Sequence, residues 1–430
     1  MKIDLNQCVS IRFSCILRFI QILIKSVLMA KTIEFPSIDR RVDLSAVTQF
    51  AEEAGQLSEE LREMMLAPKP RKMAPTFTSA QVAELCGIDR IKLNNLLATR
   101  EGLPQGEAQG SGRSRVFTLP EARTWVQQVS DIYQTPLHTG VRDADGKVIL
   151  VANFKGGSTK TTTTMCLAQG LTLRGRRVLL IDLDPQASLT ELCGLYAEKE
   201  VTEDSTVLPF IYDPQMEGGL LNFVQPTYWD GLDVIPAHPT LFSAEFHIPG
   251  TVIKNPGFKF WDLLRQGIES LRQHYDYIIL DTAPSLSYLT INALMAADAM
   301  VMPLVPESLD FISSVSFWSL FSDLAHTIME RGDEKTYDFV SVLLSKVDYG
   351  RTSSAPVVRS WVQRTYKDWV SAVEVPASSA MSNGALAMAT VFDISKGDLA
   401  DKTVARVRQP LTDYVRWIDD LYVEQWRAGK

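Results

Sequence analysis

The sequence has few of the features that mark secreted and membrane proteins. Its 430 residues include only five cysteines, none in a CxxC pair or at a regular spacing, which argues against a disulfide framework and a zinc knuckle. Long hydrophobic runs are also missing. Arg18, Gln21 and Lys25 interrupt the apolar stretch at residues 13–28 before any run reaches the ~18 residues of a spanning helix. We therefore expect a protein of the reducing cytoplasm, without a membrane-spanning helix.

An excess of positive charge is missing too. Lysine and arginine number 43 against 51 aspartates and glutamates, which gives a net charge of −8 and a pI near 5.3. An acidic chain can still bind nucleic acid, but only through local basic patches. With 430 residues, 46% of them hydrophobic, the chain can bury more than one core, so two or more domains are expected.

Residues 1–40 are interpreted as an N-terminal extension. No small-residue cleavage site of the secretory kind follows the apolar stretch, and Met29 begins an ordinary polar segment, MAKTIEFPS. Residues 1–28 are therefore interpreted as lying upstream of the normal start, Met29. The alternative is an amphipathic surface helix, because the polar residues of this stretch fall on one helical face.

Residues 41–68 predict one long helix. Apolar residues recur there at steps of three and four among charged ones, as at Leu57 and Leu61. A linker rich in proline and lysine, APKPRKMAP at residues 67–75, ends the helix. A single apolar stripe on a charged helix needs a partner, and the sequence leaves open whether the helix packs on its own domain or forms a dimerisation arm.

Residues 74–135 predict a winged helix-turn-helix. Ser79 can cap a first helix, Gly87 allows a tight turn, Asp89 can cap a second helix, and a glycine-rich excursion leads to the strand-like RSRVFT. The segment resembles the MerR-like winged helices, whose second helix enters the major groove of DNA. The expected DNA contacts are Arg90, Lys92, Asn94 and Asn95 on that helix, with Arg113 and Arg115 at the wing. The alternative is a protein-interaction domain, since three-helix units of this shape also serve that purpose.

Residues 146–430 predict an α/β domain with a doubly wound, mostly parallel sheet. Six apolar runs rich in β-branched residues alternate here with helical segments; they are residues 147–154, 177–184, 231–237, 275–282, 299–305 and 338–345. Continuous apolar strands that alternate with helices indicate a parallel sheet covered on both faces. Ligands of such folds bind beyond the carboxyl ends of the strands, so the loops after these runs are the places to look for chemistry.

The loop after the first run, in VANFKGGSTKTTTTM at residues 151–165, comes close to a phosphate-binding P-loop. The standard pattern has glycine six residues before its lysine and directly before it, whereas Lys160 has Phe154 and Thr159 in those places. Gly156 and Gly157 still let the backbone amides turn inward, and the following helix adds the positive end of its dipole. The stretch therefore predicts a cradle for a polyphosphate.

Lys160 would neutralise the outer phosphates, and the Thr161 hydroxyl is placed to coordinate magnesium. The nucleotide-binding residues expected from this stretch are Lys155, Gly156, Gly157, Ser158, Thr159, Lys160, Thr161 and Thr162. Lys155, directly before the two glycines, has no counterpart in an ordinary P-loop. Its presence therefore needs an explanation.

KGGSTKT resembles the deviant Walker A loop, KGGxxK[ST], of the ParA/MinD family of ATPases. In that family the additional lysine reaches across a nucleotide-sandwich dimer to the phosphates bound by the other subunit, and the resemblance gives this role to Lys155. The alternative is an ordinary surface lysine. Thr159 is a departure, since many relatives have glycine there. Its β-branched side chain restricts the loop, which is expected to affect ATP affinity rather than the role of the loop.

Two further segments resemble motifs of the same family. In RVLLIDLDPQASLT, Asp184 would orient or activate the attacking water and contact the magnesium shell. In YDYIILDTAPSLS, Asp281 would hold magnesium, and residues 282–284 would sense the γ-phosphate. PLVPESLDF, residues 303–311, resembles the base-recognition loop. The implied catalytic residues are Lys155, Lys160 and Asp184, and the implied metal residues are Thr161, Asp184 and Asp281.

The family serves several functions, and the sequence discriminates among them. No cysteine follows Cys193, so a subunit-bridging iron–sulfur cluster has no ligand after Asp281. Metabolic relatives such as dethiobiotin synthetase have no need of an N-terminal winged helix. MinD-like relatives end in a basic membrane helix, whereas this chain ends in LTDYVRWIDDLYVEQWRAGK, with acidic residues opposite an apolar face, the wrong sign for anionic lipid. We expect that face, formed by Leu411, Tyr414, Val415, Ile418 and Leu421, to dock on the domain, and Asp413, Asp419, Asp420 and Glu424 to form the other face.

The winged helix-turn-helix extends the resemblance to the larger, type Ia ParA partition proteins. That resemblance implies an ATPase that uses ATP/ADP and Mg²⁺, a homodimer, nonspecific DNA binding on the nucleoid, stimulation by a ParB-like partner and repression of its own operon. The candidate nonspecific DNA patch is formed by Lys346, Arg351, Arg359, Lys402, Arg406 and Arg408. Each of these alone could be an ordinary surface charge. The alternatives are a nucleotide-switched repressor and a MinD-like membrane-positioning ATPase.

Overall fold

The structure is a computed structural model that describes residues 43–66, 71–109, 115–135, 144–350, 353–378, 388–394 and 401–428. The chain divides into two compact units, Met1–Met64 and Met65–Lys430. The described part of the first unit consists almost entirely of helix α2, Leu44–Leu66, whose last two residues belong to the second unit. The Asp43 carboxylate accepts a hydrogen bond from the Ala46 amide at 2.9 Å at the start of this helix. The long helix predicted from the apolar repeat is therefore present, while the interpretation of residues 1–40 falls outside the described residues.

Residues 77–133 form a three-helix module with a small sheet. Its elements are β1 (Phe77–Thr78), α3 (Ser79–Leu85), α4 (Arg90–Thr99), β2 (Glu107–Ala108), β3 (Arg115–Phe117) and α5 (Leu119–Tyr133). The strands pair antiparallel in the order β1-β3-β2. The turn between α3 and α4 uses Gly87 at a φ of +66°, a conformation that suits glycine. This is the connectivity of a winged helix-turn-helix.

The helix caps of this module agree with the sequence at one position and differ at another. Asp89 caps α4, as predicted, by accepting from the Lys92 amide at 2.8 Å. The cap of α3 is Thr78, not Ser79, because Thr78 and Gln81 form a reciprocal capping box. Threonine and serine are both good N-caps, and the glutamine three residues after Thr78 decides between them.

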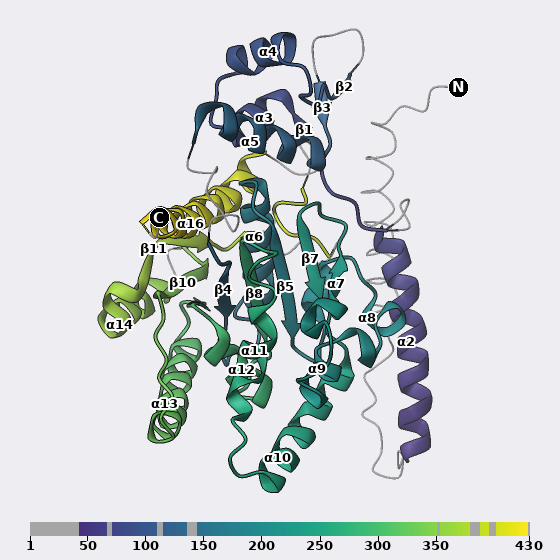
Figure 1. Cartoon of the computed structure of the whole chain (residues 1–430), viewed down its shortest axis with the longest axis vertical. Helices are drawn as coiled ribbons and strands as arrows, with labels where there is room; N and C mark the ends of the chain where they lie inside the picture. The colour runs from purple at the N-terminus through teal and green to yellow at the C-terminus, as the bar shows by residue number, and fades with distance from the viewer. Residues whose placement is uncertain are drawn as a thin grey trace, which may run out of the picture. The chain divides into compact units, whose positions relative to one another are not determined.

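A parallel sheet forms the core of the second part of the chain (Figure 1). Its strands are β4 (Lys147–Val151), β5 (Val178–Leu183), β6 (Gln225–Pro226), β7 (Leu232–Ile235), β8 (Tyr277–Thr282), β9 (Ala299–Leu304), β10 (Phe339–Val347) and β11 (Val370–Pro376). Their order is β11-β10-β9-β4-β8-β5-β7-β6, and every pair is parallel except β6 with β7. The six predicted strands are confirmed, whereas the two edge strands β6 and β11 were not predicted.

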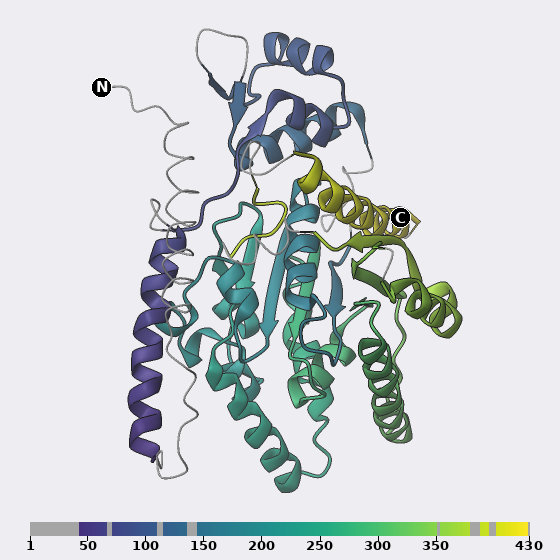
Figure 2. The ribbon, with the colours of Figure 1, turned by 180° about the vertical axis from the view of Figure 1, so that it is seen from behind.

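Helices cover both faces of this sheet (Figures 1 and 2). They are α6 (Lys160–Leu173), α7 (Ser188–Leu192), α8 (Ala197–Glu200), α9 (Leu208–Tyr212), α10 (Ala244–Lys254), α11 (Leu263–Glu269), α12 (Tyr288–Ala296), α13 (Ser308–Glu330), α14 (Ala355–Tyr366) and α16 (Asp401–Ala428), with short 3₁₀ turns at 203–205, 219–223, 239–243, 260–262 and 367–369. Alternate residues of β4 enter different cores. Ile149 and Val151 pack with α6 and α16, while Val148 and Leu150 pack with α11 and α12. Both faces of the sheet are therefore buried, as the continuous apolar strands predict.

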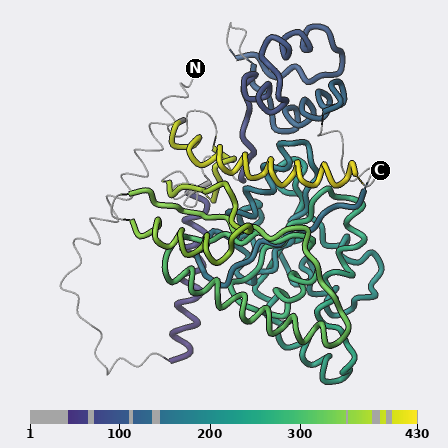
Figure 3. The backbone as a smooth tube through the Cα atoms, turned by 90° about the vertical axis from the view of Figure 1, so that its left-hand side faces the viewer, coloured from purple at the N-terminus to yellow at the C-terminus, as the bar shows by residue number. Residues whose placement is uncertain are grey.

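The C-terminal helix α16 is a docked structural helix, as expected, and runs as one long rod in Figure 3. Val415 approaches α6 so closely that a Cβ on Gly170 would lie 2.6 Å from it. Two parts of the prediction were wrong: Leu421, expected on the docked face, is exposed, and Asp419, expected on the solvated face, is fully buried. Arg174 and Arg176 both pair with it, at 2.7 and 2.8 Å. Burial by itself raises the pKa of Asp419, but the two arginines outweigh it and hold the pKa below its ordinary value.

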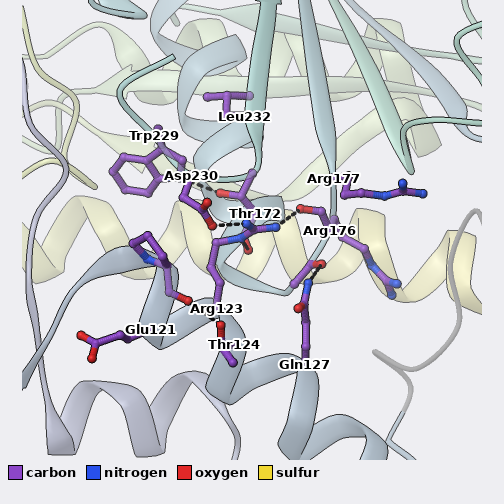
Figure 4. Close-up of polar contacts among 12 residues, drawn as sticks. Glu121, Arg123, Thr124, Gln127, Thr172, Arg176, Arg177, Trp229, Asp230 and Leu232 are labelled. Carbon is purple, nitrogen blue, oxygen red and sulfur yellow. Dashed lines mark hydrogen bonds and ion pairs between the residues drawn. The ribbon is translucent and has the colours of Figure 1, made fainter. Parts of the chain in front are cut away.

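The last helix of the winged module is fastened to the far end of α6 through Arg123 (Figure 4). This buried guanidinium donates to the Thr172 and Arg176 carbonyls, both at 3.0 Å, and pairs with Asp230. Gly231 makes room for it, since a Cβ there would lie 2.1 Å from the guanidinium carbon. The core of the module, including Trp125, is continuous with the core beneath this face of the sheet. Within the described residues, no helix is long and apolar enough to span a bilayer.

Candidate functional site

The carboxyl ends of β4, β5 and β8 meet at one edge of the sheet, where the three motif loops begin. Val151 at the end of β4 lies in register with Asp281 of β8, and Asp281 lies in register with Asp182 of β5. Chain connections leave β4 and β8 toward opposite sides of the sheet, which makes this edge a topological switch point and the expected place for a ligand. The motifs found in the sequence are therefore brought together in space.

The P-loop has the form of an open phosphate cradle. Gly156 and Gly157 are exposed, and a Cβ on either would meet no atom within 4 Å. The Ser158 hydroxyl, by contrast, is buried and has no hydrogen-bond partner among the described residues. A buried hydroxyl without a partner is costly unless a ligand supplies one. The open glycines and this unsatisfied hydroxyl, at the start of α6, fit an anionic ligand.

Lys160 and Asp281 form the charged centre of the cradle. The Lys160 ammonium donates to the Lys155 carbonyl at 3.2 Å, and burial lowers the pKa of Lys160 despite the neighbouring aspartates. The Asp281 carboxylate accepts from the Thr161 and Thr164 hydroxyls at 2.8 and 2.9 Å, while burial raises its pKa to about 6. A carboxylate paired with a hydroxyl beside a phosphate cradle is a donor set that suits magnesium, which commonly takes one or two carboxylates and completes its shell with water and phosphate.

Asp182 and Asp184 have different roles in the loop after β5. Asp184 is half-buried at the cavity wall, and its carboxylate accepts from the Gln186 amide at 3.0 Å. Asp182 is fully buried and accepts from the Thr190 amide and hydroxyl at 2.9 and 2.8 Å. Burial, followed by the charge of Asp281, raises the pKa of Asp182 to about 8. The sequence motif contained Asp182 but did not reveal that it braces this loop from inside.

A cavity of about 830 Å³ opens beside the P-loop, large enough for a nucleotide. One side is lined by the P-loop with Asp184, and the other by residues near the C-terminus of the domain: Ala377, Ser378, Met388, Ala389, Thr390, Val391 and Leu411. Residues 303–311, which resemble a base-recognition loop, do not line this cavity. The wall formed by 377–378 and 388–391 was missed at the sequence level, because no recognisable motif marks it.

The end of β10 also contacts the P-loop. Ser345 accepts a hydrogen bond from the Thr159 hydroxyl at 3.0 Å, and the Lys346 ammonium donates to the Gly157 carbonyl at 3.1 Å. Thr159 itself has a φ of +71°, in the left-handed region, which a β-branched residue adopts only at a cost of about 1–3 kcal/mol. Lys346, predicted as part of a DNA patch, is exposed and also lines the cavity.

The other residues of the predicted DNA patch differ in their surroundings. Arg359 is paired with Glu374, and Arg408 donates to the carbonyls of Val391 and Ile394. Lys402 and Arg406 are exposed on α16. Arg351 lies outside the described residues. DNA contact by these side chains therefore stays a proposal.

The predicted recognition helix has the arrangement that direct contact with DNA would need. Its four candidate side chains are all exposed: Arg90, Lys92, Asn94 and Asn95. Leu93 of the same helix is fully buried and anchors it. At the wing, Arg115 donates to the Gln105 carbonyl at 2.6 Å, so part of its hydrogen-bonding capacity is used within the module. Arg113 lies outside the described residues.

Comparison with known proteins supports the family suggested by the P-loop. An AAA domain model matches residues 146–328. Protein SopA of Escherichia coli K12 is 29% identical over 335 residues, which cover 76% of this chain and 83% of SopA. Chromosome partitioning protein ParA of Myxococcus xanthus is 33% identical over 242 residues, or 55% of this chain and 77% of that protein.

A solved structure described as a partition protein has the same fold over most of the chain. It superposes with a TM-score of 0.60 at 20% identity and covers 90% of this chain and 99% of its own. At this identity the match shows the fold. Together with the deviant lysine at 155 and the aspartates at the strand ends, these relationships show that the chain belongs to the ParA/MinD family of ATPases, among the ParA partition proteins.

Proposed function

We propose that this protein is a DNA partition ATPase that closes into a dimer around ATP and binds DNA in that state. The observation that carries the proposal is the pair of lysines at the phosphate cradle. Lys160 is buried in the loop, whereas the half-buried Lys155 ammonium has no hydrogen bond or ion pair among the described residues. A cation that the cradle does not use is available to phosphates bound by a second copy.

Hydrolysis would use the residues at the strand ends. Thr161 and Asp281 would hold magnesium, which supplies neutralisation of the phosphate charge that develops in the transition state. Lys160 would neutralise the outer phosphates from the same subunit. Asp184, half-exposed at the cavity wall, would orient the attacking water. The adenine base of the nucleotide would lie against residues 388–391, with Lys346 beside the nucleotide.

The dimer hypothesis is tested by Lys155→Ala. The variant should bind ATP about as well as the wild type, because Lys160 and the backbone cradle remain, yet lose ATP-dependent dimerisation in size-exclusion chromatography with light scattering. Lys254→Ala, at an exposed lysine on α10, is the matched control. A Lys155→Ala protein that still dimerises with ATP, and whose turnover a ParB-like partner still stimulates, would remove the cross-subunit role.

DNA binding is tested with random-sequence duplex in the presence of ADP, ATP or a non-hydrolysable analogue at several salt concentrations. Binding confined to the triphosphate states, and weakening steeply with salt, is expected for phosphate contacts. Lys402→Ala with Arg406→Ala should lower the affinity and the slope with salt together. An unchanged affinity would show that Lys402 and Arg406 are not part of the DNA-binding surface. The setting we propose is the cytoplasm, on nucleoid DNA, with a ParB-like partner that stimulates slow hydrolysis.

A second activity, repression of the protein's own operon, is favoured by the exposed side chains on α4. Arg90 and Asn94 are exposed on a helix that the buried Leu93 anchors to the module, and side chains of these types read base edges in the major groove. The test is binding to a fragment from upstream of its own gene, compared with a scrambled fragment. Equal binding to both fragments in apo, ADP and ATP states would leave the winged module without a sequence-specific role.

A further inference from the structure

Lys72 is a buried lysine in an unexpected place. It lies in the segment that leads into the winged module, more than 70 residues before β4, yet its side chain is only 9% exposed. Its ammonium pairs with Asp393 at 3.2 Å, donates to the Leu192 carbonyl at 2.8 Å and lies 4.4 Å from the centre of the Tyr228 ring. A lysine is rarely buried unless it is paired, so this contact is a built feature of the fold.

Asp393 is the hub of a buried polar cluster. It accepts hydrogen bonds from the Tyr228 hydroxyl at 2.5 Å, from the Gln169 side chain at 3.1 Å and from the Thr390 amide at 2.7 Å. The Thr390 hydroxyl in turn donates to the Gln169 side chain at 2.5 Å. Because every member is bonded to another, the turn from 390 to 393 has one defined position as long as the cluster is complete.

This cluster borders the nucleotide cavity directly. Thr390 and Val391 form part of the cavity wall, and so does Leu192, whose carbonyl accepts from Lys72. Gln169 belongs to α6, the helix that begins with Lys160. Lys72 is therefore connected to the cavity wall in two places: through Asp393 to Thr390, and directly to Leu192. It touches none of the P-loop groups.

We propose that Lys72 is a positioning residue for the nucleotide site, supplied by the segment before the winged module rather than by the ATPase domain. By holding Asp393 it fixes the wall at 388–391, against which the base would lie. Nucleotide binding and the seating of the segment at residues 71–76 are then coupled, and by linkage each stabilises the other. This inference rests on the proposed function only in that a nucleotide occupies the cavity.

The two neighbouring fastenings of the winged module provide contrasts. Arg71 pairs with Glu200 on the surface, with 74% of its side chain exposed, and such a pair contributes little. Arg123 fastens α5 to the far end of α6, at Thr172 and Arg176, and lines no part of the cavity. Loosening the module through Arg123 should therefore leave the cavity wall intact, whereas loss of Lys72 should not.

The test uses the full chain with Lys72→Met, Lys72→Arg, Arg71→Met and Arg123→Gln, and a fluorescent ADP or ATP analogue as probe. Lys72→Met should raise Kd about tenfold, because a displaced wall misplaces the bound ligand. Lys72→Arg keeps the cation and should recover most of the affinity, while Arg71→Met and Arg123→Gln should stay within about twofold of the wild type. In ATPase assays Lys72→Met should raise KM and leave kcat unchanged, since Lys72 touches no reacting group.

A purely structural lysine would give a different pattern. If Lys72→Met melts at a lower temperature but binds the analogue as the wild type does, the positioning role is overturned. Should Lys72→Met fail to fold, hydrogen exchange on the wild type decides: ADP should slow amide exchange at both 71–76 and 388–394, and an unchanged rate at 71–76 overturns the coupling. A wild-type protein that binds no nucleotide would instead refute the proposed function itself.

Discussion

The two ends of the nucleotide cavity are built in different ways. The phosphate end consists of eight consecutive residues, 155–162, which Asp281 braces through the Thr161 hydroxyl; the Thr164 hydroxyl, further along α6, donates to the same carboxylate. The far wall, at 388–391, is held through Asp393 and Thr390 by side chains from three distant parts of the chain, Lys72, Tyr228 and Gln169. A contiguous loop carries its function in its local sequence. A wall held by polar contacts between residues distant in sequence is recognisable only in the folded structure.

The largest effect should come from the phosphate end. Lys160→Gln removes the buried cation that faces both Asp281 and the expected phosphates. Charge-assisted hydrogen bonds are the strong ones, so we expect ATP affinity to fall ~100-fold, or ~2.7 kcal/mol. Isothermal titration with ATP and magnesium measures this directly, and Lys199→Gln on the surface is the control. If Lys160→Gln loses less nucleotide affinity than Lys72→Met, the far wall contributes more to binding than the phosphate end.

The sequence predicted the phosphate end and the middle of the sheet because both signals are local. Six central strands are continuous apolar runs, and the lysines and glycines of the P-loop stand side by side. The edge strand β11 escaped prediction since VSAVEVP alternates and is only partly buried, and β6 has just two residues. An edge strand has a partner on one side only, so it needs no continuous apolar pattern.

What the sequence could not supply was the pairing of charges across long distances. Asp419 looked like one of several acids on a solvated helix face, and only the fold places Arg174 and Arg176 against it. Lys346 is exposed, as a surface charge would be, but only the fold shows that its ammonium reaches the Gly157 carbonyl. A charged residue in isolation indicates exposure, and its burial is decided by partners that lie far away in the chain.

The second prediction concerns pH and again belongs to the phosphate end. The folded-state pKa of Asp182 is raised to about 8 and that of Asp281 to about 6, so the folded chain keeps protons that the unfolded chain releases near pH ~4. Nucleotide-free stability must then fall as pH rises from ~4 toward 8. Between pH 6 and 8 the fall comes from Asp182. Thermal unfolding across this range should show a flatter slope for Asp182→Asn and an unchanged slope for the exposed Asp368→Asn; equal slopes in all three proteins would contradict the assignment.

A smaller effect is expected at the far wall from Tyr228→Phe. The change removes one donor from Asp393 and one acceptor from the Gln169 side chain, but it leaves the aromatic ring over Lys72 and the other partners of Asp393 in place. One hydrogen bond to a charged group is worth about 1.5–3 kcal/mol, so urea unfolding should show a loss of that order. Kd for the fluorescent nucleotide should rise less than in Lys72→Met. A rise as large as that in Lys72→Met would make the tyrosine hydroxyl, not the lysine, the organiser of the wall.

The smallest net effect should come from Thr159→Gly, because two opposing contributions meet at that position. Glycine relieves the strain of a β-branched residue at a φ of +71°, but it loses the hydroxyl bonds to Thr163 and Ser345 and gains freedom in the unfolded chain. Relief of the strain is worth about 1–3 kcal/mol, and the two lost hydroxyl bonds together with the freer unfolded chain cost a similar total, so the free energy of unfolding should change by less than ~1 kcal/mol. Thr159→Val keeps the strain, loses the hydroxyl and should be clearly less stable than either. If valine proves as stable as threonine, the Thr159 hydroxyl does not hold the P-loop to β10, and the bonds from Ser345 to the Ser158 carbonyl and from Lys346 to the Gly157 carbonyl must hold it instead.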